Sequence, residues 1–256
     1  MCYVSRRRPN LNMRPGHVRR EGYTCDLYLV AWLDRLGIPY DVATDEDVHA
    51  AGRELLGRYP VVMTGTHPEY MSARMFDALA GWVKVGGRLM YMGGNGFSMN
   101  VGYSAERPWI MENRRVDLWE RGPDAARSEA LNSTDGLRGG WFSAGGRQPA
   151  HLTGVESAIL ASSRDHTLVP PMFGAIRPDY HADLVLYFNG GGTVFSVSSM
   201  AWAGALGHQD YDNDIARISQ NVLRRFLDPA PLARPGSSGQ NLWRAAHVCD
   251  RPGPAM

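Results

Sequence analysis

The stretch that decides the fold is PVVMTGTHPEYMSARMFDALAGWVKVGGRLMYMGGNGF, which runs from Pro60 to Phe97. It begins with an apolar run that ends at Gly65, a pattern typical of a buried parallel strand. From Ser72 apolar side chains recur at helical spacing, and GGRLMYMGG at 86–94 predicts a second strand. A strand, a helix and a strand in this order indicate an α/β protein with an open, mostly parallel sheet and flanking helices.

The segments before this stretch extend the same alternation. DLYLVAWLDRLG at 26–37 has helical spacing and ends in Gly37, which is a good helix stop. PYDVAT at 39–44 predicts a short strand, and DEDVHAAGRELLGRY at 45–59 predicts a helix with acidic residues at its N-terminus. The alternation therefore starts well before Pro60.

Two further elements are predicted near the C-terminus. ADLVLYFNGGGTVFSVSSMAW at 182–202 has apolar runs on both sides of a glycine turn, which is a hairpin signal. Between Asp214 and Pro229 a helix is expected, with one apolar face made of Ile215, Ile218, Val222, Leu223, Phe226 and Leu227.

The chain has 256 residues, of which 44% are hydrophobic, and this suffices for one large domain. We expect a single α/β domain over residues 25–228. Within it, residues from about 98 to 180 have weak periodicity and predict an irregular β-rich insertion. The Arg- and Pro-rich residues 1–24 are interpreted as a solvated arm or linker remnant, in preference to a nucleic-acid arm, and residues 229–256 as a flexible tail.

Charge and cysteine content narrow the class of protein. The formal net charge is +1, so no strong overall field attracts nucleic acid or a membrane. The three cysteines form no CxxC pair, which argues against a disulfide framework and favours a reducing cytoplasm. No apolar run approaches the roughly 20 residues that a membrane span needs. We expect a cytoplasmic protein that binds neither nucleic acid nor membrane.

Polar side chains follow both strands of the opening stretch. His67, Glu69 and Tyr70 come just after the first strand, and any of them can bind a cation or move a proton. The alternative is that they only hydrogen-bond and pack the loop. GGNGF at 93–97 follows the second strand and is either a ligand-facing loop or a tight turn. In a parallel sheet both segments lie beyond the carboxyl ends of strands, where ligands bind.

A second polar stretch, GHQDYDND at 207–214, precedes the last expected helix. Its acidic residues suit a helix N-terminus, and this interpretation is preferred to calcium binding because the EF-hand glycine and terminal glutamate are absent. Cys25 lies at a predicted helix start, and we interpret it as a structural cysteine in preference to a reactive one.

Three of these motifs resemble one known family. They are DLYLVAWLDRLGIPYDVATDEDVH, GTHPEYMS with the following MFDAL and GGRLMYMGGNGF, and SVSSMAWAGALGHQDYDNDIARISQNVLRRFLDP. Together they are similar to the C-terminal catalytic region of the N,N-dimethylformamidase large (beta) subunit. The resemblance covers about residues 25–228. It implies a class I glutamine-amidotransferase-like core and hydrolysis of an N-substituted formamide.

The resemblance also implies a cofactor and partners. Family enzymes use a single ferric ion, Fe(III), held by two tyrosines and a glutamate, and they associate with a small subunit. Tyr70 matches one tyrosine ligand and Tyr28 the other. Phenolate is a hard oxygen donor, which suits this ion. His67, Glu69 and Asn95 are then catalytic candidates, and Gly94, Phe97 and His208 are substrate-binding candidates.

One family position is changed here. In STDGLRGGWF, Leu137 stands where the glutamate ligand is expected, and leucine cannot bind iron. Asp135 is the nearest substitute, and Glu129 is a poorer one. Two functions from different classes follow. The first is metal-dependent hydrolysis of a small N-substituted amide, with a possible small subunit or homo-oligomer. The second is an inactive or truncated module that binds a small ligand or a partner subunit.

Overall fold

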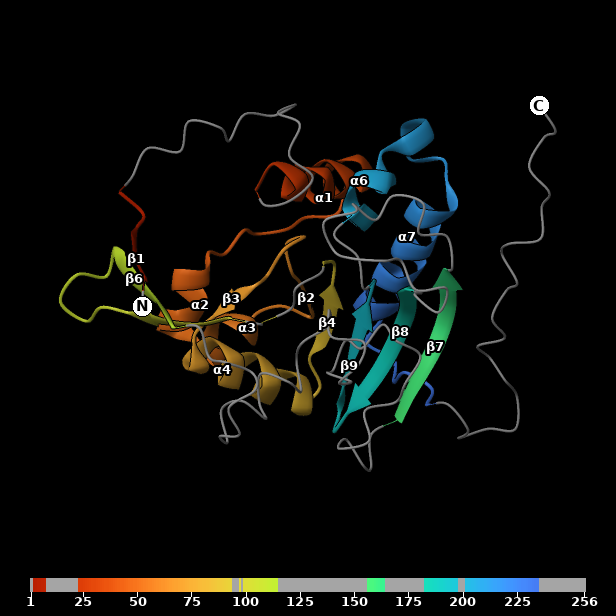
Figure 1. Cartoon of the computed structure of the whole chain (residues 1–256). Coiled ribbons are helices and arrows are strands. Elements are labelled where there is room, and N and C mark those ends of the chain that lie inside the picture. Colours follow the sequence, from red (N-terminus) through yellow and green to blue (C-terminus); the bar gives the residue numbers. More distant parts are fainter. Residues whose placement is uncertain are drawn as a thin grey trace, which may run out of the picture.

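The computed structural model describes residues 2–7, 23–93, 97, 99–114, 156–163, 182–197 and 201–234 (Figure 1). The helices are α1 (Tyr23–Leu36), α2 (Asp45–Ala51), α3 (Arg53–Leu56), α4 (Ala73–Lys84), α6 (Ala201–Leu206), the 3₁₀ helix η2 (His208–Tyr211) and α7 (Asp214–Leu227). The strands are β1 (Cys2–Ser5), β2 (Val61–Met63), β3 (Tyr70–Met71), β4 (Arg88–Tyr91), β5 (Met99–Tyr103), β6 (Ile110–Arg114), β7 (Glu156–Ser163), β8 (Ala182–Asn189) and β9 (Gly192–Ser196). Among these described helices, none is long and apolar enough to cross a membrane.

The main sheet has the strand order β2-β4-β9-β8-β7. β2 and β4 pair in parallel, as the opening sequence stretch predicts, and β9 also pairs in parallel with β4. β8 pairs antiparallel with both β9 and β7, so the sheet is mixed, which corrects the expectation of a mostly parallel sheet. The β8–β9 pairing confirms the predicted hairpin. The expectation of an α/β protein is confirmed, and the insertion contributes β7 to the edge of this sheet.

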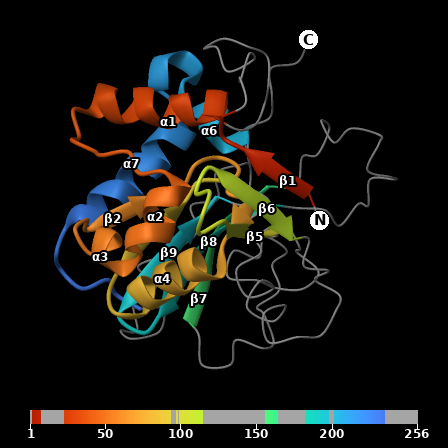
Figure 2. The same ribbon diagram turned by 90° about the vertical axis from the view of Figure 1, so that its left-hand side faces the viewer.

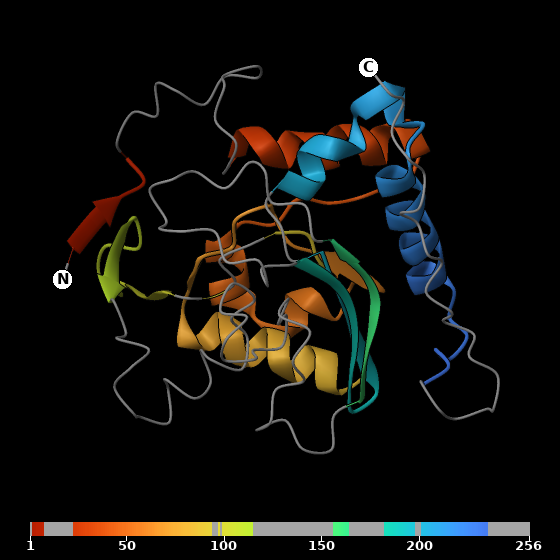
Figure 3. The same cartoon turned by 45° about the vertical axis from the view of Figure 1, so that its right-hand side comes forward.

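Helices cover both faces of the main sheet, because alternate residues of each strand point to opposite sides. Leu89 and Tyr91 of β4 pack in a cluster with residues of α3 and α4. Met90 of β4 and the following Met92 pack in a second cluster with residues of α1, α6 and α7. Figures 1 and 3 show the resulting layers, with the sheet between α4 on one side and α1, α6 and α7 on the other.

A small sheet with the order β1-β6-β5-β3 lies beside α2 and α4 (Figure 2). β1 comes from the segment that was expected to be an arm, and it pairs antiparallel with β6. An ion pair between Arg6 and Glu46 joins the end of β1 to α2. β3 immediately follows the polar loop after β2 and pairs in parallel with β5. The small sheet therefore fixes the exit of that loop.

The strand predicted over 39–44 is wrong, because this segment has no regular structure. Its side chains bond to neighbouring segments in place of a strand ladder. The Tyr40 hydroxyl donates to Asp34 at 3.1 Å, and Asp41 accepts from the Tyr59 hydroxyl at 2.9 Å. Thr44 ends the segment as the N-cap of α2, in a capping box with Asp47.

The predicted boundaries of α1 and α7 agree well with the structure, whereas the helix predicted over 45–59 is interrupted. At the end of α1, Gly37 has a φ of 64°. The Gly37 amide donates to the Asp34 carbonyl and the Ile38 amide donates to the Leu33 carbonyl, which is a Schellman motif. Gly52, with a φ of 55°, separates α2 from α3.

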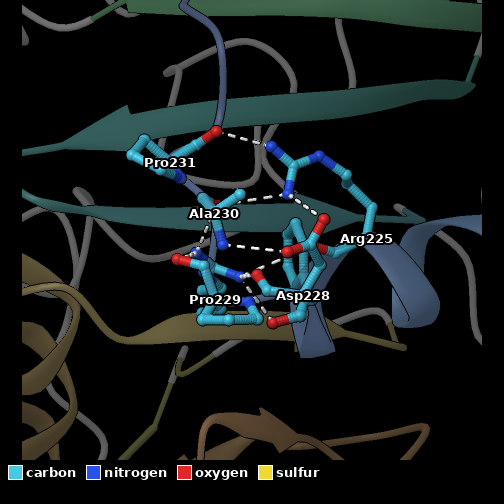
Figure 4. A network of polar contacts seen from close by, with 7 residues as sticks. Arg225, Asp228, Pro229, Ala230 and Pro231 are labelled. Atoms are coloured by element: carbon cyan, nitrogen blue, oxygen red, sulfur yellow. Dashed lines mark hydrogen bonds and ion pairs between the residues drawn. The ribbon is translucent and has the colours of Figure 1, made fainter.

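Two arginine side chains hydrogen-bond to backbone carbonyls at the end of α7 and in the segment that follows it. Arg88 of β4 donates to the carbonyls of Phe226 at 2.7 Å and Ala230 at 2.9 Å, and also bonds to that of Asp228. Arg225 donates to the carbonyls of Ala230 and Pro231, as Figure 4 shows. Residues 229–234, the described start of the expected tail, are therefore held against the domain.

Candidate functional site

The two polar segments follow neighbouring strands of the main sheet, and Gly93 and Phe97 are the described residues of the second one. We call residues 67–70 the HPEY segment and residues 93–97 the GGNGF segment. They follow β2 and β4, which are parallel neighbours. The Phe97 amide donates to the Pro68 carbonyl at 2.8 Å, which joins the two segments directly. The predicted adjacency is confirmed for Phe97, whereas residues 94–96 lie outside the described residues.

Two threonines fix the loop between β2 and the HPEY segment by hydrogen bonds. The Thr64 amide donates to the Met90 carbonyl at 3.0 Å, and the Thr64 hydroxyl accepts from the Met92 amide at 3.0 Å. Thr66 is completely buried, and both its amide and its hydroxyl donate to Asp26 of α1. The HPEY segment thus starts from backbone that is tied to β4 and to α1.

Pro68 bends the HPEY segment. The Glu69 amide donates to the His67 carbonyl at 2.8 Å, so His67, Pro68 and Glu69 form a γ-turn, for which the fixed φ of proline is suitable. This turn brings His67 Nε2 to 3.4 Å from Glu69 Oε2, with 16% and 20% of the two side chains exposed. The pair is partly shielded from water, and an imidazole next to a carboxylate can take up and release protons.

The Tyr70 side chain interacts with the Glu69 carboxylate of this pair. It is 40% exposed, so its ring has a route to solvent. Partial burial raises the pKa of Tyr70, and the charge of Glu69 and a hydrogen bond with Glu69 raise the pKa further. The phenol therefore keeps its proton next to a carboxylate. A cation that displaced this proton would meet two hard oxygen donors, which is the donor chemistry that ferric iron prefers.

Sequence reasoning missed a second group of polar side chains beside the HPEY segment. His49 Nδ1 of α2 lies 2.7 Å from the hydroxyl of Ser72, which is the N-cap of α4. The His49 ring lies against Tyr103 of β5, with 4.6 Å between centroids. Burial and then Arg74 lower the pKa of His49, while burial and then Asp45 raise the pKa of Tyr103 to about 12. Sequence periodicity gives no signal for contacts between residues this far apart.

Asp45 and Asp26 are a further pair of acidic residues near this group. Desolvation, and then the charge of Asp26, raise the pKa of the Asp45 carboxyl. Both residues lie in the first turn of a helix, where a carboxylate is favoured by the helix dipole. They place negative charge near the start of the HPEY segment.

The structure places three of the predicted site residues on segments other than the HPEY segment. Tyr28 is on α1 and is 45% exposed, and among the described residues no hydrogen bond joins it to the HPEY segment. Phe97 is 3% exposed, and its ring packs against Tyr91 with 5.7 Å between centroids, so the structure places it in the core. His208 is exposed in η2, next to Asp210, which pairs with Arg35 at the far end of α1.

The remaining predicted site residues, Gly94, Asn95 and Asp135, lie outside the described residues, as do Glu129 and Leu137. Among the residues that the structure describes, no three His, Cys, Asp or Glu side chains form a group able to hold a metal ion. Glu69 and Tyr70 supply oxygen donors from adjacent positions, so any site built on them needs further donors.

The fold and the site together define an α/β protein with a polar site at the carboxyl ends of neighbouring parallel strands. Residues 1–171 match the model of a family described as N,N-dimethylformamidase beta subunit-like, C-terminal. The chain belongs to this family, which confirms the resemblance found in the sequence.

Two relatives support the same assignment. The chain is 33% identical to the N,N-dimethylformamidase beta subunit of Paracoccus aminophilus, over 90% of the chain and 41% of that protein. It is 32% identical to the N,N-dimethylformamidase beta subunit of an Alcaligenes species, over 91% of the chain and 41% of that protein. The chain therefore spans less than half the length of these relatives.

Proposed function

We propose that this chain hydrolyses a small N-substituted amide of the formamide type to an amine and a carboxylate. The observation that carries the proposal is the grouping of His67, Glu69 and Tyr70 beyond β2. The comparisons also support the proposal, because both relatives are named as subunits of N,N-dimethylformamidase. We also propose that the α/β core is of the class I glutamine-amidotransferase-like type.

The proposed cofactor is a single ferric ion held by Tyr70, with Tyr28 and Asp135 as further ligands. The support from the structure is the hard-oxygen character of Tyr70 and its hydrogen bond to Glu69. When bound, such an ion supplies Lewis acidity that polarises an amide carbonyl and acidifies a nearby water. Because the pKa of Tyr70 is raised, uptake of the ion is expected to release a proton and to strengthen as pH rises.

His67 and Glu69 are proposed to move the protons of the reaction. His67 accepts a proton from the attacking water, and the Glu69 carboxylate 3.4 Å away stabilises the imidazolium that forms. The same proton then passes to the nitrogen of the leaving amine as the carbon–nitrogen bond breaks. The partial burial of both side chains strengthens their mutual attraction.

A partner subunit is part of the proposal, because both relatives are named as beta subunits. Since the chain spans 41% of each relative, the remaining ligands and the substrate pocket can also depend on segments or subunits outside it. Activity is therefore tested for the chain alone and in complex with its partner.

The first test is uptake of Fe(III), followed by elemental analysis and the visible tyrosinate-to-iron absorption band. We expect about one iron per chain, and loss of the band in Tyr70→Phe. Tyr40→Phe is the matched control, because Tyr40 is 37% exposed and Tyr70 is 40% exposed. Release of formate from N-substituted formamides is then measured for both variants.

The outcomes separate the two classes of function. Iron-dependent hydrolysis that is lost in Tyr70→Phe and kept in Tyr40→Phe supports the amidase. Full hydrolysis in Tyr70→Phe would contradict the proposed mechanism. Tight binding of an amide or a partner subunit without turnover, in the chain and in its complex, would favour the inactive binding module instead.

A further inference from the structure

Asp26 makes a link between α1 and the loop that leads into the HPEY segment. Its Oδ1 accepts from the Thr66 amide at 2.6 Å and from the Thr66 hydroxyl at 2.9 Å. The two residues are 40 positions apart in the sequence. Thr66 is completely buried, and His67 follows it directly. A short bond from a buried amide to a carboxylate is among the stronger hydrogen bonds in a protein.

Glycines allow this link to be close. A Cβ on Gly65 would lie 2.9 Å from both carboxylate oxygens of Asp26. A Cβ on Gly93 would lie 2.3 Å from the Thr66 carbonyl oxygen. The backbone at 65–66 is therefore in contact with Asp26 and with the end of β4. It has little freedom to shift.

The link adds a polar contact on one flank of α1, next to the face that packs in the core. Leu29 and Trp32 form part of its buried face. At about 100° per residue, Asp26 and Tyr28 lie on opposite flanks of that face. An anchor on the Asp26 flank therefore opposes a rotation of α1 that would move Tyr28.

We propose that Asp26 is a positioning residue, which holds the HPEY segment and α1 in the relative placement that the metal-ligating tyrosines require. This inference rests on the proposed function, because Tyr28 and Tyr70 are ligands only there. Asp26 itself is not a ligand in this proposal, since its Oδ1 is occupied by the two Thr66 donors. It acts in the way that outer hydrogen-bond partners orient metal ligands.

The first measurement is hydrogen–deuterium exchange of the metal-free full chain, comparing wild type with Asp26→Asn and Asp26→Ala. We expect faster exchange from Thr66 through Met71, with α7 unchanged. Asp34→Asn is the matched control, because Asp34 is an exposed acid on the same helix that also accepts a side-chain hydrogen bond. Unchanged exchange over 66–71 in both Asp26 variants would overturn the inference, and this holds whether or not iron binds.

The second measurement is titration of the same proteins with Fe(III). Changing an outer hydrogen-bond partner typically weakens metal binding by roughly 10- to 100-fold, and we expect this for Asp26→Asn, with a shifted absorption band. Thr66→Ser keeps both donors and should bind as wild type, whereas Thr66→Val loses one donor and should not. A general loss of stability would lower the melting temperature of these variants without changing the band.

The two proposals fail in different ways. If wild type takes up no iron, alone or with its partner subunit, the metal mechanism fails. The exchange experiment still tests whether Asp26 holds the Thr66 backbone in place. If wild type takes up iron and Asp26→Asn binds it equally well with an unshifted band, the positioning role is wrong while the proposed function stands. If Asp26→Ala does not fold, Asp26→Asn and Thr66→Val carry the test.

Discussion

Gly93 lies at the end of β4 and packs directly against the backbone of Thr66. A Cβ at this position would come 2.3 Å from the carbonyl oxygen and 2.5 Å from the carbonyl carbon of Thr66. These are backbone atoms, so a rotamer change cannot relieve the clash. The glycine therefore permits the close approach of the two segments that form the candidate site.

We predict that Gly93→Ala destabilises the protein by about 1–3 kcal/mol, the usual cost of an overpacked site. Urea unfolding measures this change. The control is Gly204→Ala in α6, where a Cβ meets nothing within 4 Å. That change should be neutral or stabilising by up to about 1 kcal/mol, because alanine favours a helix. Equal stability of both variants would contradict the close packing of Gly93 against Thr66.

At the scale of an element, Asn213 organises the start of α7. Its Oδ1 accepts from the Ala216 amide at 2.9 Å, which caps the helix. Its Nδ2 donates to the carbonyls of Leu206 at 3.0 Å and His208 at 2.7 Å. One side chain therefore joins the end of α6, the η2 turn and α7. This confirms that GHQDYDND prepares a helix N-terminus, as the sequence indicated.

Asn213→Ala should lower the free energy of unfolding by about 1–2 kcal/mol, which is the upper part of the range for a lost N-cap. The effect is large because the carbonyls that accept from Asn213 Nδ2 also lose their donor. Thermal or urea denaturation gives the value. Asp212→Ala is the adjacent control, since the Asp212 side chain is exposed and, among the described residues, its one interaction is a surface ion pair with Arg217 at 3.6 Å. Its expected effect is below about 0.5 kcal/mol. A larger effect at Asp212 than at Asn213 would contradict this assignment.

At the scale of the whole molecule, the half-buried Tyr103 and the buried Tyr187 are expected to make stability depend on alkaline pH. Burial, and then Asp45, raise the pKa of Tyr103 in the small sheet to about 12. Burial also raises the pKa of Tyr187 in the main sheet. The usual pKa of a tyrosine phenol is about 10. Above that pH the unfolded chain loses these protons before the folded chain does, so folding is disfavoured as pH rises.

We predict that the free energy of unfolding falls from about pH 10 upward and that the fall continues to about pH 12, the range between the unfolded and folded pKa values of Tyr103. Urea unfolding at a series of pH values measures the slope. Tyr103→Phe should make the slope shallower, because phenylalanine binds no proton. Tyr40→Phe, on the surface, should leave most of it. A slope unchanged in Tyr103→Phe would be inconsistent with this account.

The sequence by itself determined the elements whose signals are local. The apolar run before Gly65, the helix from Ser72 and the strand before Gly93 defined a βαβ unit, because helix and strand periods depend on neighbouring residues. The end of α1 at Gly37 followed from local capping rules. The motifs also identified the family, and they located the HPEY and GGNGF segments beyond neighbouring parallel strands.

The tertiary structure alone decided which distant side chains meet. Asp26 of α1 reaches Thr66 in the loop after β2, and His49 of α2 reaches Ser72 at the start of α4. No periodicity encodes such pairs, because they depend on how the elements pack against each other. For the same reason 39–44 forms no strand, since side-chain bonds to Asp34 and Tyr59 replace a ladder. Phe97 likewise lies in the core, where its ring packs against the ring of Tyr91.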